Sequence, residues 1–140
     1  MITTERDDSP ASSTNHAMNP ILLIVDDDTA VREGLKLALE LKGYEVASAP
    51  DAESAIDWLT TATPALVILD WQLPGMSGAE AAGYIRGRFT KLPILGISAH
   101  RESEEEMVRN GVTAFRPKPL DIRKFVSDID GLTGTARGLS

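Results

Sequence analysis

Two short aliphatic runs, each followed directly by aspartate, constrain the fold of this chain more than any other feature. The runs are Ile21–Val25, which leads into Asp26, and Ala65–Leu69, which leads into Asp70. Five consecutive aliphatic residues are typical of a strand buried on both faces, as in a parallel sheet covered by helices. The first polar residue after such a run marks the carboxyl edge of the sheet, where open α/β folds bind ligands.

Around these runs, apolar residues alternate between strand spacing and helical spacing. Further strands are predicted at 44–48, 93–97 and 113–116, and a helix is predicted after each of the five strands. The apolar faces of these helices are Val31, Leu35, Ala38 and Leu39; Ala52, Ala55, Ile56 and Leu59; Ala82, Ile85 and Phe89; Met107 and Val108; and Ile122, Phe125, Val126 and Ile129. This alternation predicts an α/β fold, a doubly wound (βα)5 parallel sheet with helices on both faces, because parallel strands need right-handed crossovers.

The length of 140 residues fits one domain with an ordinary core and is too short for two. Residues 1–19 are rich in Ser, Thr, Asn, Asp and Pro, so they are expected to form a disordered N-terminal tail, with Met18 as an alternative translation start. The folded domain is expected over residues 20–132. Few apolar groups and several glycines near the end predict a flexible C-terminal tail over residues 133–140.

Two helix starts carry a recognisable capping signature. Ser77 with Glu80, and Ser103 with Glu106, have the Ser-x-x-Glu spacing of a capping box, so the third and fourth helices are expected to begin there. The acids of the fourth helix are expected to form a solvated face. Trp71, in the turn-rich loop after Asp70, is expected at the surface.

The acidic balance of the chain excludes several classes of function. It has 14 Lys and Arg against 21 Asp and Glu, a formal charge of -7, and no basic stripe, so direct binding to nucleic acid or to a membrane surface is disfavoured. Since the chain has no cysteine, disulfides, thiolate zinc sites and cysteine catalysis are excluded. The sequence shows neither a signal peptide nor a stretch able to span a bilayer, so a cytoplasmic location is expected.

Several polar side chains are expected at one edge of the predicted sheet. Asp26, Asp27, Asp70, Ser98 and Lys118 each end a predicted strand or follow one within a few residues. Because ligands bind beyond the carboxyl ends of such strands, these residues are expected to converge on one site. Two carboxylates about 4 Å apart repel each other by roughly 4 kcal/mol at an effective dielectric constant of ~20, so three of them need a cation or protons.

Oxygen ligands alone favour Mg²⁺, which keeps several waters and a position for a phosphate oxygen. Lys118 adds a compact positive charge suited to a phosphoryl group. A carboxylate beside Mg²⁺ and lysine can attack phosphorus and form an acyl phosphate. Asp70 is the best candidate because it extends from the central strand next to an exposed turn, while Asp26 and Asp27 would position the metal. Ser98 could donate a hydrogen bond to a phosphoryl oxygen.

The chain also resembles a known family. The matching segments are Ile24–Asp28, Leu69–Asp70 with Leu73–Gly78, Ser98–Ala99, and Phe115 with Lys118–Pro119. In this order and at these spacings they are similar to the receiver domain of response regulators in two-component signalling, over about residues 20–132. The resemblance implies a flavodoxin-like sheet with the strand order 2-1-3-4-5.

The resemblance also implies a phosphoacceptor and a metal site. Asp70 would receive a phosphoryl group from a histidine kinase or a histidine phosphotransfer protein. Asp27, Asp70 and the backbone carbonyl of Gln72 would bind Mg²⁺ directly, and Asp26 would bind it through a water molecule.

By the same resemblance, Ser98 and Phe115 would form a switch pair, in which Ser98 moves toward the phosphate and Phe115 turns inward. The peptide bond between Lys118 and Pro119 would be cis and would aim the lysine amine into the site. Since little follows Gly131, a stand-alone receiver without an output domain is expected. It would signal through its fourth helix, fifth strand and fifth helix, as a monomer or as a phosphorylation-dependent homodimer.

Two other functions stay open for this sequence. A receiver-like adaptor would use the same surface constitutively, without being phosphorylated. A Mg²⁺-dependent aspartyl-phosphate phosphatase of the haloacid-dehalogenase kind also places its nucleophilic aspartate after a strand. That family needs a second acid two residues beyond the nucleophile, where this chain has Gln72, so enzymatic turnover is not expected.

Overall fold

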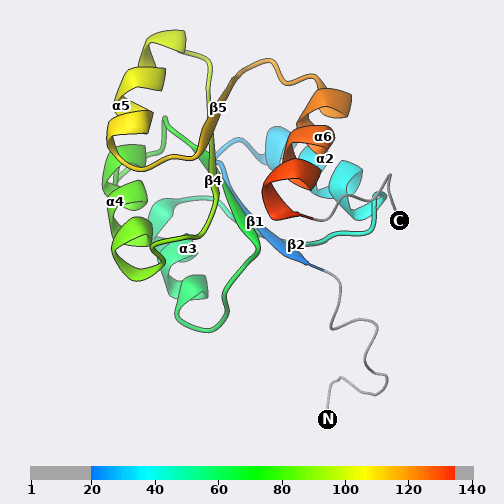
Figure 1. The fold of residues 1–140 in the computed structure, drawn as a ribbon, viewed down its shortest axis with the longest axis horizontal. Helices are drawn as coiled ribbons and strands as arrows, with labels where there is room; N and C mark the ends of the chain where they lie inside the picture. Colours follow the sequence, from blue (N-terminus) through cyan, green and yellow to red (C-terminus); the bar gives the residue numbers. More distant parts are fainter. Residues whose placement is uncertain (1–19, 135–140) are drawn as a thin grey trace.

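The computed structural model describes residues 20–134, over which strands and helices alternate (Figure 1). The elements are β1 (Ile21–Val25), α2 (Thr29–Glu40), β2 (Glu45–Ala49), α3 (Ala52–Leu59), β3 (Leu66–Asp70), α4 (Gly78–Arg88), β4 (Ile94–Ser98), the 3-10 turn η1 (Arg101–Ser103), α5 (Glu104–Arg109), β5 (Ala114–Pro117) and α6 (Ile122–Thr133). The predicted N-terminal tail, and residues 135–140 of the predicted C-terminal tail, lie outside the described residues. None of the helices within residues 20–134 is long and apolar enough to cross a membrane.

The five strands form one parallel sheet in the order β2-β1-β3-β4-β5, which confirms the predicted order. The direction in which strands are added reverses between β1 and β3, the position where doubly wound sheets bind ligands. In the register of the sheet, Val25 lies opposite Leu69, and Asp70 lies opposite Ile97. The carboxyl ends of β1, β3 and β4 are therefore level with one another at one edge.

Helices cover both faces of the sheet, with α2 and α6 on one face and α3, α4 and α5 on the other (Figure 1). Alternate residues of β1 point into the two layers, so Leu22 and Ile24 pack with Leu35 of α2 and Phe125 of α6. Each fully buried side chain of this size contributes roughly 1.5–3 kcal/mol relative to an exposed one. The buried strands thus hold the sheet edge in a fixed position.

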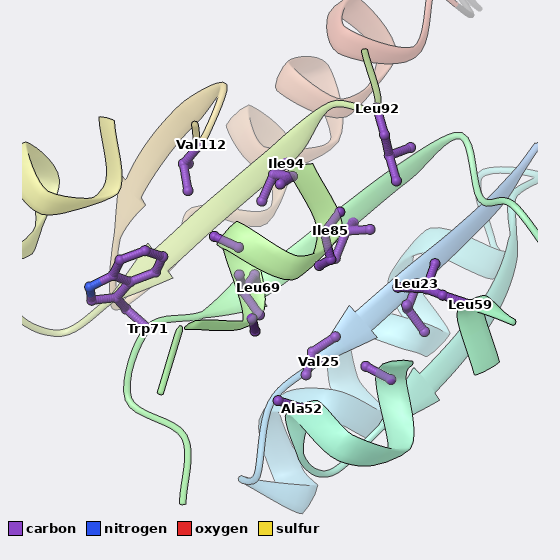
Figure 2. Close-up of a cluster of buried hydrophobic side chains, with 14 of the residues drawn as sticks. Leu23, Val25, Ala52, Leu59, Leu69, Trp71, Ile85, Leu92, Ile94 and Val112 are labelled. Carbon is purple, nitrogen blue, oxygen red and sulfur yellow. The ribbon is translucent and has the colours of Figure 1, made fainter. Parts of the chain in front are cut away.

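The second core cluster lies under α3, α4 and α5, and it extends from Leu23 and Leu59 at one end to Trp71 and Val112 at the other (Figure 2). Trp71 is 5% exposed, so its predicted surface position was wrong. The indole packs closely against Gly78 at the start of α4, because a residue that directly follows a central strand lies beneath the next helices.

A helix commonly begins after a residue whose side chain accepts a hydrogen bond from one of the first free backbone N–H groups. The capping box of α4 is confirmed: Ser77 Oγ accepts a hydrogen bond from Glu80 N, and the Glu80 carboxylate accepts one from Ser77 N. The box predicted for Ser103 and Glu106 is not formed, and that prediction was wrong. Ser103 ends η1 with a helical backbone conformation and makes no side-chain cap, while the Glu106 carboxylate accepts a hydrogen bond from an indole in the loop after β3.

Candidate functional site

Three aspartates from two neighbouring strands meet at the carboxyl edge of the sheet. Asp26 and Asp27 follow β1 and Asp70 ends β3, and one carboxylate oxygen from each lies within 4.8 Å of those from the other two. Asp26 and Asp70 are buried and Asp27 is exposed. The cluster therefore has one side in the protein interior and one side open to solvent.

Backbone and side-chain contacts hold Asp26 in place. Its Oδ1 accepts a hydrogen bond of 2.9 Å from Asp28 N, and its backbone oxygen accepts one of 2.7 Å from Arg32 Nη1. Asp26 Oδ2 is buried and accepts no hydrogen bond from residues 20–134, although the Lys118 ammonium lies 3.1 Å away. A buried carboxylate oxygen in this situation remains available to a cation or a water molecule.

Lys118 reaches the cluster from the end of β5. Its backbone N–H donates a hydrogen bond of 2.8 Å to Ser98 O, and its peptide bond to Pro119 is cis. The Nζ atom lies 3.2 Å from Asp70 Oδ2 and 3.1 Å from Asp26 Oδ2. Burial opposes the charge of Lys118, but the carboxylates of Asp70 and Asp26 outweigh it and raise the pKa of the ammonium, so the lysine is charged at neutral pH.

The Asp70 carboxyl is 3% exposed and is strongly perturbed. Burial raises the pKa of Asp70 to about 6, and the negative charge of Asp26 adds to the increase. The Gln72 backbone N–H, which donates to Asp70 Oδ1 at 3.1 Å, and the charge of Lys118 both oppose it. One ammonium thus stands against three carboxylates, and the excess negative charge favours binding of a cation.

Ser98 lies beside Asp70 at the end of β4 and is fully buried. Its Oγ donates a hydrogen bond of 2.7 Å to Gln72 Oε1 and accepts one of 2.9 Å from His100 N. Phe115, the other residue of the implied switch pair, is 8% exposed in β5 and belongs to the core cluster under α3, α4 and α5. The phenyl ring therefore already lies inward in this structure.

Two side-chain contacts at the site were not predicted from the sequence. Trp71 Nε1 donates a hydrogen bond of 2.7 Å to Glu106 Oε1 in α5, and Gln72 accepts the hydrogen bond from Ser98 through its side chain. The family resemblance implied a metal-binding role for the backbone carbonyl of Gln72, and it did not indicate the side-chain contact with Ser98. The paired residues are 35 and 26 positions apart, so no local spacing indicates either contact.

The donor set fits Mg²⁺. Carboxylate oxygens are the hard ligands that this ion prefers, and three of them can converge here. The hydrogen-bonding capacity of Asp26 Oδ2 is unused within the described part of the chain, which agrees with a ligand position on the buried side.

Similarity to known proteins extends over most of the chain. The family model for the response regulator receiver domain matches residues 22–130. Response regulator MprA of Mycobacterium tuberculosis (strain ATCC 25177 / H37Ra) is 35% identical over 118 residues, which are 82% of this chain and 51% of that protein. MprA of Mycolicibacterium vanbaalenii is 35% identical over 114 residues, 79% of this chain and 49% of that protein. The chain thus spans about half the length of these curated relatives.

Solved structures of response regulators share this fold over nearly their own full length. A putative response regulator from Chloroflexus aurantiacus J-10-fl has a TM-score of 0.79 and 29% identity, covering 83% of this chain and 98% of that chain. Response regulator TrrA of Thermotoga maritima, solved in complex with Mg²⁺-BeF, has a TM-score of 0.76 and 29% identity, covering 81% of this chain and 98% of that chain. With the family match extending from β1 into α6, this chain belongs to the response regulator receiver domain family of two-component systems.

Proposed function

We propose that this receiver domain is switched by phosphorylation of Asp70, with Mg²⁺ bound beside it. The observation that carries the proposal is the cluster of Asp26, Asp27 and Asp70 oxygens within 4.8 Å of one another, with Lys118 Nζ 3.2 Å from Asp70 Oδ2. The phosphoryl donor would be a histidine kinase or a histidine phosphotransfer protein, in keeping with the family.

Asp70 suits the acceptor role better than Asp26 does. Asp26 is fully buried in the short turn between β1 and α2, whereas Asp70 is followed by a loop with the exposed residues Gln72, Pro74 and Gly75. A donor can therefore approach from the loop side. With a pKa of about 6, the Asp70 carboxyl is mostly ionised above neutral pH, and the carboxylate is the nucleophilic form.

The metal would be held directly by the carboxylates of Asp27 and Asp70 and the backbone carbonyl of Gln72, and through a water molecule by Asp26. When bound, Mg²⁺ would neutralise negative charge on the phosphoryl oxygens. Because Asp27 is exposed and Asp26 is buried, the residues that would hold the ion extend from the protein interior to the solvent.

In the transfer, an Asp70 carboxylate oxygen forms a bond to phosphorus while the bond between phosphorus and the donor's histidine nitrogen breaks. The imidazole nitrogen keeps the electron pair of that bond, and the product is an acyl phosphate on Asp70. Lys118 is placed to stabilise negative charge on a phosphoryl oxygen, and Ser98 can donate its hydroxyl hydrogen to another.

The output surface would consist of α5, β5 and α6. Ser98 ends β4 next to β5, and Phe115 of β5 packs in the core cluster that includes Met107 of α5. A displacement of Ser98 toward the phosphoryl group would therefore change the packing of both β5 and α5. Partner proteins, or a second copy of the domain, would recognise this surface in its phosphorylated form.

An apolar cavity beside the site offers a docking position for the phosphoryl donor. Its volume is about 560 Å³, and its lining includes Val31 and Gly34 of α2, Leu120 and Ile122 after β5, and Lys118. A donor protein seated over this cavity would have its histidine close to the lysine that contacts Asp70.

The decisive experiment follows tryptophan fluorescence as Mg²⁺ and then beryllofluoride, a phosphoryl analogue, are added. Wild type should respond only with Mg²⁺ present, and Asp70→Asn should not respond. Asp57→Asn, which changes an exposed aspartate of α3, is the matched control and should respond like wild type. In parallel, acetyl phosphate should add one phosphoryl group to wild type, detected by intact mass, and none to Asp70→Asn.

Two outcomes would replace this proposal by another function. Wild type that neither responds to beryllofluoride nor takes a phosphoryl group from acetyl phosphate would favour the constitutive adaptor. Sustained release of phosphate from a generic phosphate ester would favour the phosphatase.

A further inference from the structure

Gln72 contacts both the phosphoacceptor and the switch serine. Its backbone N–H donates a hydrogen bond of 3.1 Å to Asp70 Oδ1, and its side-chain Oε1 accepts one of 2.7 Å from Ser98 Oγ. A single residue of the loop after β3 therefore orients the carboxylate that would be phosphorylated and the hydroxyl that would sense the phosphoryl group.

The Ser98 hydroxyl is fully committed in this arrangement. Ser98 is fully buried, so water does not compete for its hydroxyl group. The backbone N–H of His100 donates to the oxygen at 2.9 Å, and the one hydroxyl hydrogen is directed at Gln72 Oε1. A serine hydroxyl has a single hydrogen to donate. Ser98 thus cannot donate to a phosphoryl oxygen until its hydrogen bond to Gln72 is broken.

We propose that the Gln72 side chain is a latch that holds Ser98 in the unphosphorylated conformation. The inference rests on the proposed function, because it assumes a phosphoryl group on Asp70 as the competing acceptor. Gln72 is then a positioning residue that acts through Ser98 and sets how readily the domain switches.

The relative strengths of the two possible hydrogen bonds of Ser98 predict which conformation is favoured after phosphorylation. A hydrogen bond between neutral groups is weaker than one to an ionised acceptor, so Ser98 would exchange Gln72 for a phosphoryl oxygen once one is present. The latch reduces the gain from that exchange without preventing it. Removing the acceptor atom of Gln72 should therefore favour the phosphorylated conformation by a modest factor.

A double-mutant cycle of Gln72→Met and Ser98→Ala tests the latch. Methionine keeps the length of the glutamine side chain and removes the strong acceptor. With Mg²⁺ saturating and tryptophan fluorescence as the readout, Gln72→Met should bind beryllofluoride about three- to tenfold more tightly than wild type, as loss of one neutral hydrogen bond allows. In the Ser98→Ala background the same substitution should have no effect, because no hydroxyl remains to be held.

Ser103→Ala is the matched serine control, because Ser103 lies in the following segment and makes no side-chain cap. It should leave the effect of Gln72→Met unchanged. Equal or weaker beryllofluoride binding by Gln72→Met would overturn the latch. So would tighter binding that persists in full without the Ser98 hydroxyl, since Gln72 would then act by another route. If wild type itself does not bind beryllofluoride, the proposed function fails, which is a different result from a responsive wild type that Gln72→Met does not alter.

Nuclear magnetic resonance provides a readout that does not depend on affinity. Gln72 is the only glutamine in the sequence, so its side-chain amide signal can be identified directly. That signal should shift in Ser98→Ala and when beryllofluoride binds to wild type, and it should not shift in Ser103→Ala. A signal that Ser98→Ala leaves in place would show that the hydrogen bond is absent in solution and would overturn the latch.

Discussion

At the level of single residues, Asp70 combines burial with a negative charge that its surroundings do not fully balance. Asp26 lies in the same cluster, and the one ammonium nearby, Lys118 within the described residues, is shared by both carboxylates. Such a site is suited to a ligand that brings positive charge, and the protein without that ligand should be strained electrostatically.

This strain predicts how stability depends on pH in the absence of Mg²⁺. The pKa of Asp70 is about 6 in the folded state against a usual value of 3.8, so between these values the folded state binds more protons than the unfolded state. Its contribution to the free energy of unfolding therefore falls as the pH rises through this window. Asp70→Asn should be more stable than wild type above pH ~6.5, by about 1–2 kcal/mol after allowance for solvent screening.

Urea unfolding in EDTA at several pH values measures this difference. The advantage of Asp70→Asn should shrink steadily toward about pH 4, where wild-type Asp70 is protonated in the folded state. Asp57→Asn, in exposed α3 surface, is the control and should show no such pH-dependent difference. A constant difference between wild type and Asp70→Asn at all pH values would contradict the raised pKa.

At the level of secondary-structure elements, α5 is held by few contacts. The helix has six residues, of which Met107 alone is buried, and Val108 is 63% exposed. The hydrogen bond from Trp71 Nε1 to Glu106 therefore forms a large part of the attachment of α5 to the loop after β3. A bond to a charged acceptor is also stronger than one between neutral groups.

Glu106→Ala should lower the free energy of unfolding by about 1 kcal/mol, because it leaves the Trp71 indole N–H without this acceptor. Amide hydrogen exchange should become faster in α5 and stay unchanged in α2. Glu105→Ala is the matched control on the same helix, since Glu105 is exposed and lies 3.9 Å from Arg109 on the surface. Equal effects of the two substitutions would indicate that only helix charge matters.

Two glycines of α4 should respond in opposite directions to alanine. A Cβ atom at Gly78 would lie 2.8 Å from the Trp71 Cα, a backbone atom that cannot move aside by rotating a side chain. Gly78→Ala should therefore destabilise the domain by about 1–3 kcal/mol. Gly83 has no atom within 4 Å of the corresponding position, so Gly83→Ala should stabilise the helix by up to ~1 kcal/mol.

Thermal unfolding of the two variants provides the comparison. Gly78→Ala should lower the melting temperature and Gly83→Ala should raise it. A neutral Gly78→Ala would mean that β3 and α4 can separate more easily than their close packing indicates.

At the level of the whole molecule, the acidic edge should make stability depend on divalent cations. A ligand that binds only the folded state stabilises it by about 2.7 kcal/mol at 100 times its dissociation constant. Mg²⁺ should therefore raise the melting temperature of wild type by several degrees relative to EDTA, and Asp27→Asn should largely lose the increase. Asp57→Asn should retain it. An equal increase in Asp27→Asn would place the ion elsewhere.

Most of the fold could be predicted from the sequence, because the patterns that indicate strands and helices lie in neighbouring residues. Buried parallel strands must be apolar on both faces, so Ile21–Val25 and Leu66–Leu69 are recognisable without any knowledge of their partners. The aspartates after these strands could be predicted for the same reason, since the edge of the sheet coincides with the end of an apolar run. The Ser77 capping box is equally local, because both of its hydrogen bonds lie within four residues.

What the sequence by itself determined is therefore the order of the strands and helices and the gathering of Asp26, Asp27, Asp70 and Lys118 at one edge. Only the tertiary structure decided that Trp71 is buried, that Glu106 leaves its expected capping role to accept the indole N–H, and that Gln72 engages Ser98. The physical reason is the sequence separation of the residues that interact. Apolar periodicity and strand ends are encoded in neighbouring residues, whereas a hydrogen bond between two loops depends on how separate elements pack, which no local pattern records.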